Sequence, residues 1–252
     1  MIVFDADDTL WRTQELYDEA KARFFAWLAE LGHDPGAAVS AYTEIDLANV
    51  ARLGFSRERF PSSMEATYRA LCSSRSREPD PAGVVQARTF ATWVFDSTPE
   101  LRPDAEAALE RLEGSFRLIL FTAGDPDVQW ARIQGSGLSG RFDHVHVVAQ
   151  KTVGTWRALL EEVSAVPERT WSVGNSVRSD INPALELGLR CVLIAARSWA
   201  YEQASLPPEG SYSPSAGVWR AETLTDAADI ILSLTHGPAR ADGIRLEDPS
   251  RR

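Results

Sequence analysis

The chain has 252 residues, of which 44% are hydrophobic and 25% charged, and its formal net charge is −10 at pH 7. This composition is typical of a soluble globular protein, and the length allows one large α/β domain or a core domain with an inserted partner. The acidic balance argues against nucleic acid as a partner, because phosphate binding needs concentrated Lys and Arg. No apolar run reaches the ~18 residues of a membrane span. We therefore expect neither a nucleic-acid nor a membrane partner.

The chain contains two cysteines, Cys72 and Cys191. Two are too few for a disulfide framework, and the N-terminus lacks a basic segment followed by an apolar one, as a secretion signal would have. We therefore expect a cytoplasmic protein. The sequence leaves the oligomeric state open between a monomer and a homodimer.

Residues 1–4 form an apolar run that is typical of a buried strand in an α/β sheet. Three carboxylates, those of Asp5, Asp7 and Asp8, follow at the point where this strand ends. Ligands of open α/β sheets bind just beyond the carboxyl ends of the strands. Because neighbouring carboxylates repel each other, a divalent cation is the simplest group to offset them. The sequence thus predicts a magnesium site at the strand tip, with a carboxylate free for chemistry.

Further apolar runs alternate with segments of helical spacing along the chain. Strands are predicted at residues 117–121, 145–148, 170–173 and 190–194, and helices at residues 127–134, 153–163 and 180–187. This alternation predicts a doubly wound parallel sheet of the α/β class. Right-handed crossovers would then bring all strand tips to one edge.

Residues 14–98 interrupt this rhythm with helix-like segments, such as 14–31 and 82–95, and with no convincing strand. We predict a core domain made of residues 1–13 and 99–235, and an inserted all-helical cap at 14–98. An insertion after the first strand emerges at the edge where the strand tips lie, so it is well placed to act as a lid; the simpler alternative is that it only adds core. The polar tail, residues 236–252, is expected to be poorly ordered.

Four polar motifs follow predicted strands in a fixed order. They are Asp5-x-Asp7-x-Thr9, then Thr122 with Ala123 and Gly124, then Lys151, and finally Gly174-Asn175 with Asp180. Together they resemble the haloacid dehalogenase-like (HAD) hydrolase superfamily, whose motifs are DxDx[TV], a Ser or Thr, a Lys, and an acidic signature. The resemblance covers about residues 1–13 and 100–234. It implies a Rossmann-like core, with the insertion in the place of a C1-type helical cap.

The resemblance assigns the chemistry to the first motif. Asp5 would be the nucleophile that attacks phosphorus and forms an aspartyl-phosphate. Asp7 would protonate the leaving oxygen and then deprotonate the hydrolytic water, a role suited to a carboxyl group with a raised pKa. Thr9 would hold the geometry of the loop beside the phosphate.

The phosphate-binding group predicted in this way consists of Thr9, Thr122, Ala123 and Lys151. Thr122 offers a hydroxyl, and the backbone N–H groups of Ala123 and Gly124 lie close to it in the sequence. Such donors at a helix start suit a phosphoryl group. Lys151 would add a cation for the transferring oxygens and for Asp5.

Magnesium is the cofactor that the resemblance implies. Its predicted ligands are Asp5, the main-chain carbonyl of Asp7, and Asp180 or Asn175, since Mg²⁺ prefers hard oxygen donors. Asn175 departs from the family pattern, which usually has an acid at this position. Which of Asn175 and Asp180 touches the metal is left open.

The expected function is a Mg²⁺-dependent phosphatase that hydrolyses a small phosphorylated metabolite. A phosphomutase on the same scaffold would keep both acids of the first motif and pass the phosphate to a second hydroxyl. A dehalogenase is disfavoured by Asp7, because that branch of the family lacks the second acid. A non-catalytic ligand- or protein-binding module is supported only by Asn175.

Two other patterns carry less weight. His144 and His146 share one face of a predicted strand, but without a cysteine or a third ligand nearby they do not indicate a zinc site. Residues 135–140 match the glycine pattern GxGxxG. They follow a predicted helix rather than a strand, so a helix end is expected there and not a dinucleotide site.

Overall fold

A computed structural model describes residues 1–196, 204–208, 211–213 and 215–236. Six strands in this part of the chain form one parallel sheet in the order β3-β2-β1-β4-β5-β6. The strands are β1 (Ile2–Phe4), β2 (Leu118–Ala123), β3 (His144–Val148), β4 (Trp171–Gly174), β5 (Arg190–Ile194) and β6 (Gly217–Ala221). The chain crosses between the two sides of β1 after β3, which places the tips of β1, β2 and β4 side by side.

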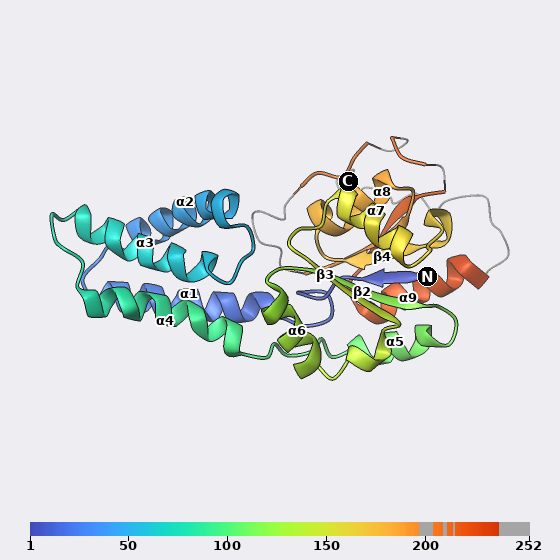
Figure 1. The fold of residues 1–252 in the computed structure, drawn as a ribbon, viewed down its shortest axis with the longest axis horizontal. Coiled ribbons are helices and arrows are strands. Elements are labelled where there is room, and N and C mark those ends of the chain that lie inside the picture. Colours follow the sequence, from blue (N-terminus) through green and yellow to red (C-terminus); the bar gives the residue numbers. More distant parts are fainter. Residues whose placement is uncertain (197–203, 209–210, 214, 237–252) are drawn as a thin grey trace, which may run out of the picture.

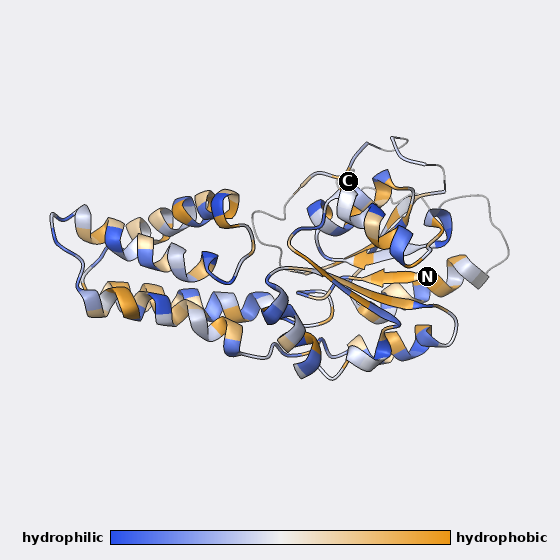
Figure 2. Ribbon diagram, in the orientation of Figure 1, coloured by the Kyte–Doolittle hydropathy of each residue, from blue (hydrophilic) through white to orange (hydrophobic). Residues whose placement is uncertain are grey.

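Side chains that alternate along the strands build two separate cores, one on each face of the sheet. Ile2 and Phe4 face the layer of α5 (Ala105–Glu113), α6 (Pro126–Gly135) and α9 (Leu224–His236). Val3 faces the layer of α7 (Val153–Glu162) and α8 (Asn182–Glu186). Figure 1 shows the sheet between these layers, and Figure 2 shows its strands as the most hydrophobic part of the ribbon. The predicted doubly wound α/β fold is confirmed.

Four helices between β1 and β2 form a body of their own beside the sheet (Figure 1). They are α1 (Thr13–Glu30), α2 (Pro35–Leu53), α3 (Arg59–Ser73) and α4 (Pro81–Asp96). Their apolar faces bury a third core that is separate from both faces of the sheet, with Phe24, Leu28, Phe60 and Met64 at its centre. The inserted helical segment is thus confirmed as part of the fold. The exact domain bounds, 14–98 for the cap and 1–13 with 99–235 for the core, stay a prediction.

Local signals explain how these helices begin. Asp34 and Asp80 cap α2 and α4, and a proline follows each of them at the first helical position. Pro61 does not interrupt α3, because it lies in the first turn, where its missing N–H would have no helical partner. The GxGxxG segment begins in the last turn of α6 and continues beyond it, as expected, with Gly137 in a left-handed conformation at φ 72°.

The structure adds elements that the sequence analysis did not predict, namely β6, α5 and α9. β6 is an edge strand whose residues are mostly half-buried, so its apolar signal is weak. The predicted helix at 180–187 begins earlier, as a π-helical turn, η3 (Val177–Ile181), which leads into the short α8. Of the predicted tail, His236 ends α9, and residues 237–252 lie outside the described residues. None of the helices in the described ranges combines the length and the apolar character that a bilayer crossing requires.

Candidate active site

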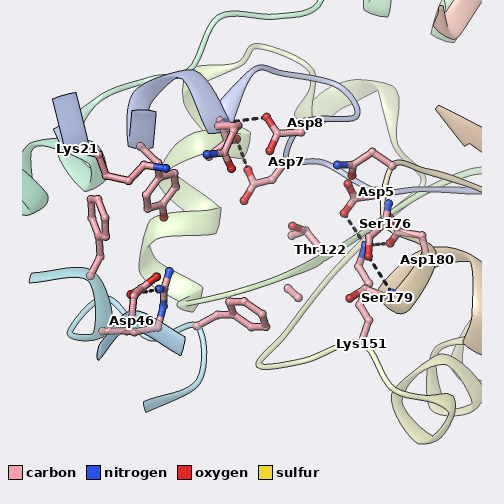
Figure 3. Close-up of a pocket in the computed structure, with 18 of the residues that line it drawn as sticks. Asp5, Asp7, Asp8, Lys21, Asp46, Thr122, Lys151, Ser176, Ser179 and Asp180 are labelled. Carbon is pink, nitrogen blue, oxygen red and sulfur yellow. Dashed lines mark hydrogen bonds and ion pairs between the residues drawn. The ribbon is translucent and has the colours of Figure 1, made fainter. Parts of the chain in front are cut away.

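A pocket of about 160 Å³ lies at the carboxyl ends of β1, β2 and β4, between the sheet and the inserted helices. Figure 3 shows its two walls. Asp5, Lys151 and Asp180 lie on the sheet side, and Lys21 and Asp46 lie opposite them. Residues that are far apart in the sequence therefore meet where the parallel strands end, as expected for this fold class.

Lys151 bridges two carboxylates at the bottom of the pocket. Its Nζ lies 2.5 Å from Asp5 Oδ1 and 2.6 Å from Asp180 Oδ1, and the three side chains are almost completely buried. The backbone N–H of Asp5 donates to the carbonyl of Val173 at 2.9 Å, which fixes the tip of β1 against β4. The predicted nucleophile, the predicted lysine and the predicted acid of the fourth motif are thus brought together.

The charges of this cluster do not balance. Burial raises the pKa of Asp5 to about 7, and the nearby Asp180 adds to the rise, while Lys151 partly offsets it. Burial alone would lower the pKa of Lys151, but the carboxylates of Asp180 and Asp5 outweigh burial and raise it. Lys151 therefore stays protonated, and one cation faces two buried acids. A second cation would favour the ionised form of Asp5.

The backbone around Asp180 is held by side chains of neighbouring elements. Asp180 belongs to η3, and its Oδ2 accepts the backbone N–H of Ser176 at 3.0 Å. The hydroxyl of Ser172 donates to the Asp180 carbonyl, and the Trp156 indole N–H donates to the Ser179 carbonyl, each at 2.9 Å. These bonds fix the π-helical turn against β4 and α7.

The donors at the pocket fit Mg²⁺, which takes hard oxygen ligands. Asp5, Asp180 and Asn175 all line the pocket, and the surplus of negative charge favours a cation among them. Thr9 does not line it. Its buried hydroxyl donates to Asn175 Oδ1 at 3.2 Å, so Thr9 orients the amide that replaces the usual acid.

Asp7 is held by four side chains rather than left free in the pocket. Its Oδ1 accepts from the Trp11 indole and the Thr13 hydroxyl at 2.7 Å, and its Oδ2 accepts from Gln129 at 2.9 Å and Arg132 at 3.1 Å. Burial raises the pKa of Asp7, but Arg132 and these hydrogen bonds outweigh burial and leave it below its ordinary value. The raised pKa that the sequence analysis associated with its role is therefore not present in this arrangement.

Gln129 and Arg132 are residues that the sequence analysis missed. Both lie on the buried face of α6, together with Val128 and Ile133, whereas Trp130 on the same helix is 43% exposed. The sequence did hold a signal, since these two polar side chains lie three residues apart within the apolar stripe of α6. Positions in such a stripe normally face a core, so polar residues there indicate a buried polar partner. Their burial is explained by Asp7, to which both donate.

Thr122 and its neighbours form the floor of the pocket near the tip of β2. The Thr122 hydroxyl donates to Gln129 Oε1 at 3.4 Å, and both Thr122 and Ala123 line the pocket. The backbone N–H of Gly124 donates to the carbonyl of Val148 at 2.8 Å, so it already has a partner within the fold. Of the donors predicted around Thr122, the Gly124 N–H is therefore used by the fold itself.

Asp8 is a further acid of the pocket to which the sequence analysis gave no role. Its backbone is left-handed, with φ 60°, a conformation that Asp tolerates better than most residues. Its Oδ1 accepts the backbone N–H of Gln14 in the first turn of α1 at 2.7 Å. Burial and the nearby carboxylates of Asp7 and Asp5 raise the pKa of Asp8 to about 7, although the bond from Gln14 opposes this shift. Asp8 therefore caps the first helix of the insertion.

The opposite wall belongs to the inserted helices. A buried ion pair joins Arg59 Nη1 to Asp46 Oδ1 at 2.5 Å, and the Ser63 hydroxyl donates to the same oxygen at 2.7 Å. Lys21 and Tyr42 also line the pocket. The backbone N–H of Arg57 reaches Asp125 at the start of α6, at 3.4 Å, and so connects the insertion with the core near the pocket.

Comparisons with known proteins agree with this geometry. The sequence matches the haloacid dehalogenase-like hydrolase family over residues 1–188. The chain belongs to this family. It is therefore a HAD-like hydrolase, and the family predicted from the four motifs is confirmed.

Curated relatives of this HAD-like hydrolase include two phosphatases. A phosphoserine phosphatase from Thermus thermophilus is 30% identical over 192 residues, which cover 73% of this chain and 72% of the relative. A glyceraldehyde 3-phosphate phosphatase from Pyrococcus furiosus is 27% identical over 198 residues, 76% of this chain and 79% of the relative.

Among solved structures, a haloacid dehalogenase-like family hydrolase from Xanthomonas campestris has a TM-score of 0.75 at 21% identity, with coverage of 92% of this chain and 94% of that one. Solved 2-haloacid dehalogenases also share the fold. At these identities the likeness establishes the fold alone.

Proposed function

We propose that this HAD-like hydrolase is a magnesium-dependent phosphatase that acts on a small phosphorylated metabolite through an aspartyl-phosphate. The observation that carries the proposal is the bridge from Lys151 to Asp5 and Asp180 at 2.5 and 2.6 Å, at the edge of a pocket that Thr122 also lines. A carboxylate, a cation and a hydroxyl thus converge where a phosphoryl group would bind.

In the first step, a carboxylate oxygen of Asp5 forms a bond to phosphorus as the bond from phosphorus to the leaving oxygen breaks. Lys151 and Thr122 stabilise the charge on the phosphoryl oxygens. Asp7 takes up a proton from solvent as substrate binds and gives it to the leaving oxygen, which departs as an alcohol. Since Arg132 lowers the pKa of Asp7, this protonation is favoured only when the phosphate brings negative charge next to Asp7.

In the second step, Asp7 takes a proton from a water molecule that attacks the phosphorus of the aspartyl-phosphate. The bond from phosphorus to Asp5 breaks, and inorganic phosphate is released. The lowered pKa of Asp7 keeps it ionised at neutral pH, which suits this role as a base. Asp7 then releases this proton to solvent, and Asp5 and Asp7 are again carboxylates beside protonated Lys151.

Asp5, Asp180, Asn175 and the main-chain carbonyl of Asp7 would hold the Mg²⁺ ion. When bound, Mg²⁺ supplies positive charge to the phosphoryl oxygens and to ionised Asp5. Asp180 is the direct ligand in this proposal, because its Oδ1 and Asp5 Oδ1 contact the same ammonium group. Asn175, held by Thr9, binds directly or through water.

The substrate is a compact phosphate monoester. A space of about 160 Å³ is smaller than the ~300–1,000 Å³ of typical drug-sized ligand pockets. The two phosphatase relatives are named for phosphoserine and glyceraldehyde 3-phosphate, which are both three-carbon monoesters. We propose a cytoplasmic location, which two buried and unpaired cysteines favour.

The test is phosphate release from a panel of phosphorylated three-carbon compounds, sugar phosphates and nucleoside monophosphates, with Mg²⁺ and with EDTA. Phosphate should be released from a few small monoesters, and this release should stop in EDTA. In Asp5→Asn it should fall by at least about 10³-fold. Asp229→Asn, an exposed acid paired with Arg111 far from the pocket, is the matched control and should behave as wild type. Undiminished turnover in Asp5→Asn would refute the assignment.

The same panel, extended with 2-haloacids and with a melting-temperature readout, separates the competing functions. A phosphomutase would yield an isomeric monoester instead of inorganic phosphate, and a dehalogenase would release halide from 2-haloacids. A binding module would show ligand-induced stabilisation without turnover. Quantifying phosphate, halide and organic products, together with ligand-induced stabilisation, therefore distinguishes the phosphatase, the phosphomutase, the dehalogenase and the binding module.

A further inference from the structure

His144, His146 and Glu162 form a cluster of metal-type ligands outside the catalytic pocket. The two histidines belong to β3, the edge strand of the sheet, and Glu162 is the last residue of α7. None of the three lines the pocket that contains Asp5. The phosphatase proposal makes no use of them.

The fold brings the three side chains together for simple geometric reasons. His144 and His146 are two residues apart on a strand, so they point to the same face. Their register partners on β2 are Ile119 and Phe121, which belong to the core beneath α7. Glu162 lies three residues after the buried Leu159, hence one helical turn along the inner edge of α7.

The ligand atoms lie at distances suited to a shared ion. His144 Nε2 is 3.2 Å from Glu162 Oε1, and His146 Nδ1 is 3.0 Å from Glu162 Oε2. One ligand atom from each of the three residues can be chosen so that all three atoms lie within 4.8 Å of one another. Donors bound to one tetrahedral Zn²⁺ at ~2.0–2.1 Å lie roughly 3.3 Å apart, so small adjustments would complete the site.

A second observation points to a missing ligand. Within the described residues, His144 Nε2 is buried and has no hydrogen-bond partner, although the Glu162 carboxylate is close to it. Buried polar atoms normally find partners, and an orphan calls for an explanation such as an ion. The two imidazole rings are stacked, with their centroids 6.0 Å apart and an interplanar angle of 28°.

We propose that His144, His146 and Glu162 bind a divalent transition metal of borderline softness, with Zn²⁺ as the best match. Two imidazoles and a carboxylate favour Zn²⁺ over Mg²⁺, which takes oxygen ligands. The side chains are 29%, 27% and 47% exposed, so an ion can enter from solvent and keep water at the fourth position. The third ligand, whose absence argued against zinc at the sequence level, is supplied by α7.

A bound ion would connect β3 and α7, the two elements that flank the segment carrying Lys151. This segment leaves β3 after Val148 and enters α7 at Val153. His146 packs against Phe121 at 5.7 Å between ring centroids, and Lys151 Nζ lies 5.3 Å from the same Phe121 ring. An ion that binds the folded state alone raises its stability. The site is therefore a cross-link between an edge strand and a helix.

Zn²⁺ titration of the purified full chain by calorimetry, in excess Mg²⁺ so that the oxygen-lined pocket is occupied, tests the proposal. Wild type should bind one Zn²⁺ per chain, and His144→Ala, His146→Ala and Glu162→Gln should each weaken it by at least about tenfold. Glu161→Gln, the adjacent carboxylate, is the matched control and should leave binding unchanged. Co²⁺ bound in place of Zn²⁺ should give the intense visible absorption of a four-coordinate ion.

The variants should retain Mg²⁺-dependent phosphate release, which shows that they fold and separates this proposal from the proposed function. If His144→Ala or His146→Ala fails to fold, Glu162→Gln, which preserves side-chain shape, decides the test. Zn²⁺ binding that is equal in all variants, or absent in wild type, would overturn the site.

Discussion

The backbone of Gly174 lies directly against the carboxylate of Asp180. A Cβ atom at position 174 would overlap the carboxylate Oδ2 and carboxyl carbon of Asp180. Gly174 ends β4, and Asp180 follows it within the π-helical turn, so the carboxylate folds back onto the strand tip. The glycine of the fourth motif thus makes room for the acid that faces Asp5 and Lys151.

Gly174→Ala should displace Asp180 and lower the apparent Mg²⁺ affinity and kcat/KM by about 10–100-fold, because the added Cβ pushes a proposed metal ligand out of position. The measurement is phosphate release over a range of Mg²⁺ concentrations. Gly114→Ala is the control, since a Cβ there meets nothing within 4 Å. If Gly174→Ala keeps wild-type Mg²⁺ dependence, the close approach has no role in the metal site.

Lys151→Met should lower kcat by at least about 10²–10³-fold, because a preorganised cation at the phosphoryl oxygens is removed. It also leaves Asp5 and Asp180 without their shared counterion, at a cost of about 3–5 kcal/mol in the free energy of unfolding. Added Mg²⁺ would replace part of that charge. The increase in melting temperature on adding Mg²⁺ should therefore be larger in Lys151→Met than in wild type.

Asp5→Asn is the counterpart of this test. This variant should also lose turnover, but it lacks one carboxylate instead of the cation. Mg²⁺ should therefore raise its melting temperature less than that of wild type. Equal Mg²⁺ effects in the two variants would contradict the placement of the metal between Asp5 and Asp180.

Arg132→Ala should shift the pH dependence of phosphate release. Arg132 lowers the pKa of Asp7, so its removal raises that pKa, and the limb of the pH profile that reports Asp7 should move to higher pH. Profiles of kcat between pH 4 and about 9 provide the measurement. Arg132→Lys keeps a cation and should move the limb less. A profile that falls in amplitude without moving would show that Arg132 acts through stability alone.

The same pair affects acid stability. The folded-state pKa of Asp7 lies below its unfolded value, so Asp7 contributes stability that is complete above the unfolded pKa and is lost as pH falls through the folded one. In Arg132→Ala this contribution should shrink, and the dependence of unfolding free energy on pH in the acid range should flatten. Urea unfolding at several acid pH values checks this.

Lys21→Ala should raise KM by about tenfold with little change in kcat, because Lys21 lines the pocket wall opposite Asp5 and does not contact the reacting group. Arg23→Ala, on the same helix and paired with Glu19, serves as the control and should leave KM unchanged. A loss confined to kcat in Lys21→Ala would mean that the helical wall contributes to chemistry and not to substrate binding.

The sequence by itself determined the parallel core and the order of its motifs. Strands with both faces buried appear in the sequence as continuous apolar runs, and parallel strand tips share one edge of the sheet. The resemblance of the four motifs to the HAD family then singled out Asp5, Thr122, Lys151 and Asp180, which the pocket brings together. The helical insertion was visible for a similar reason, because its apolar residues recur with the period of a helix.

Contacts that do not lie at the strand tips could be identified only from the tertiary structure. Arg132 and Gln129 reach Asp7 from α6 across more than a hundred residues, and Glu162 reaches His144 and His146 from the end of α7. Which side chain of a helix meets which residue of another element depends on how the helix is rotated and packed on the sheet. A local apolar stripe shows which face of a helix is buried, but not which residues of another element that face meets, whereas burial of the strands follows from their apolar runs.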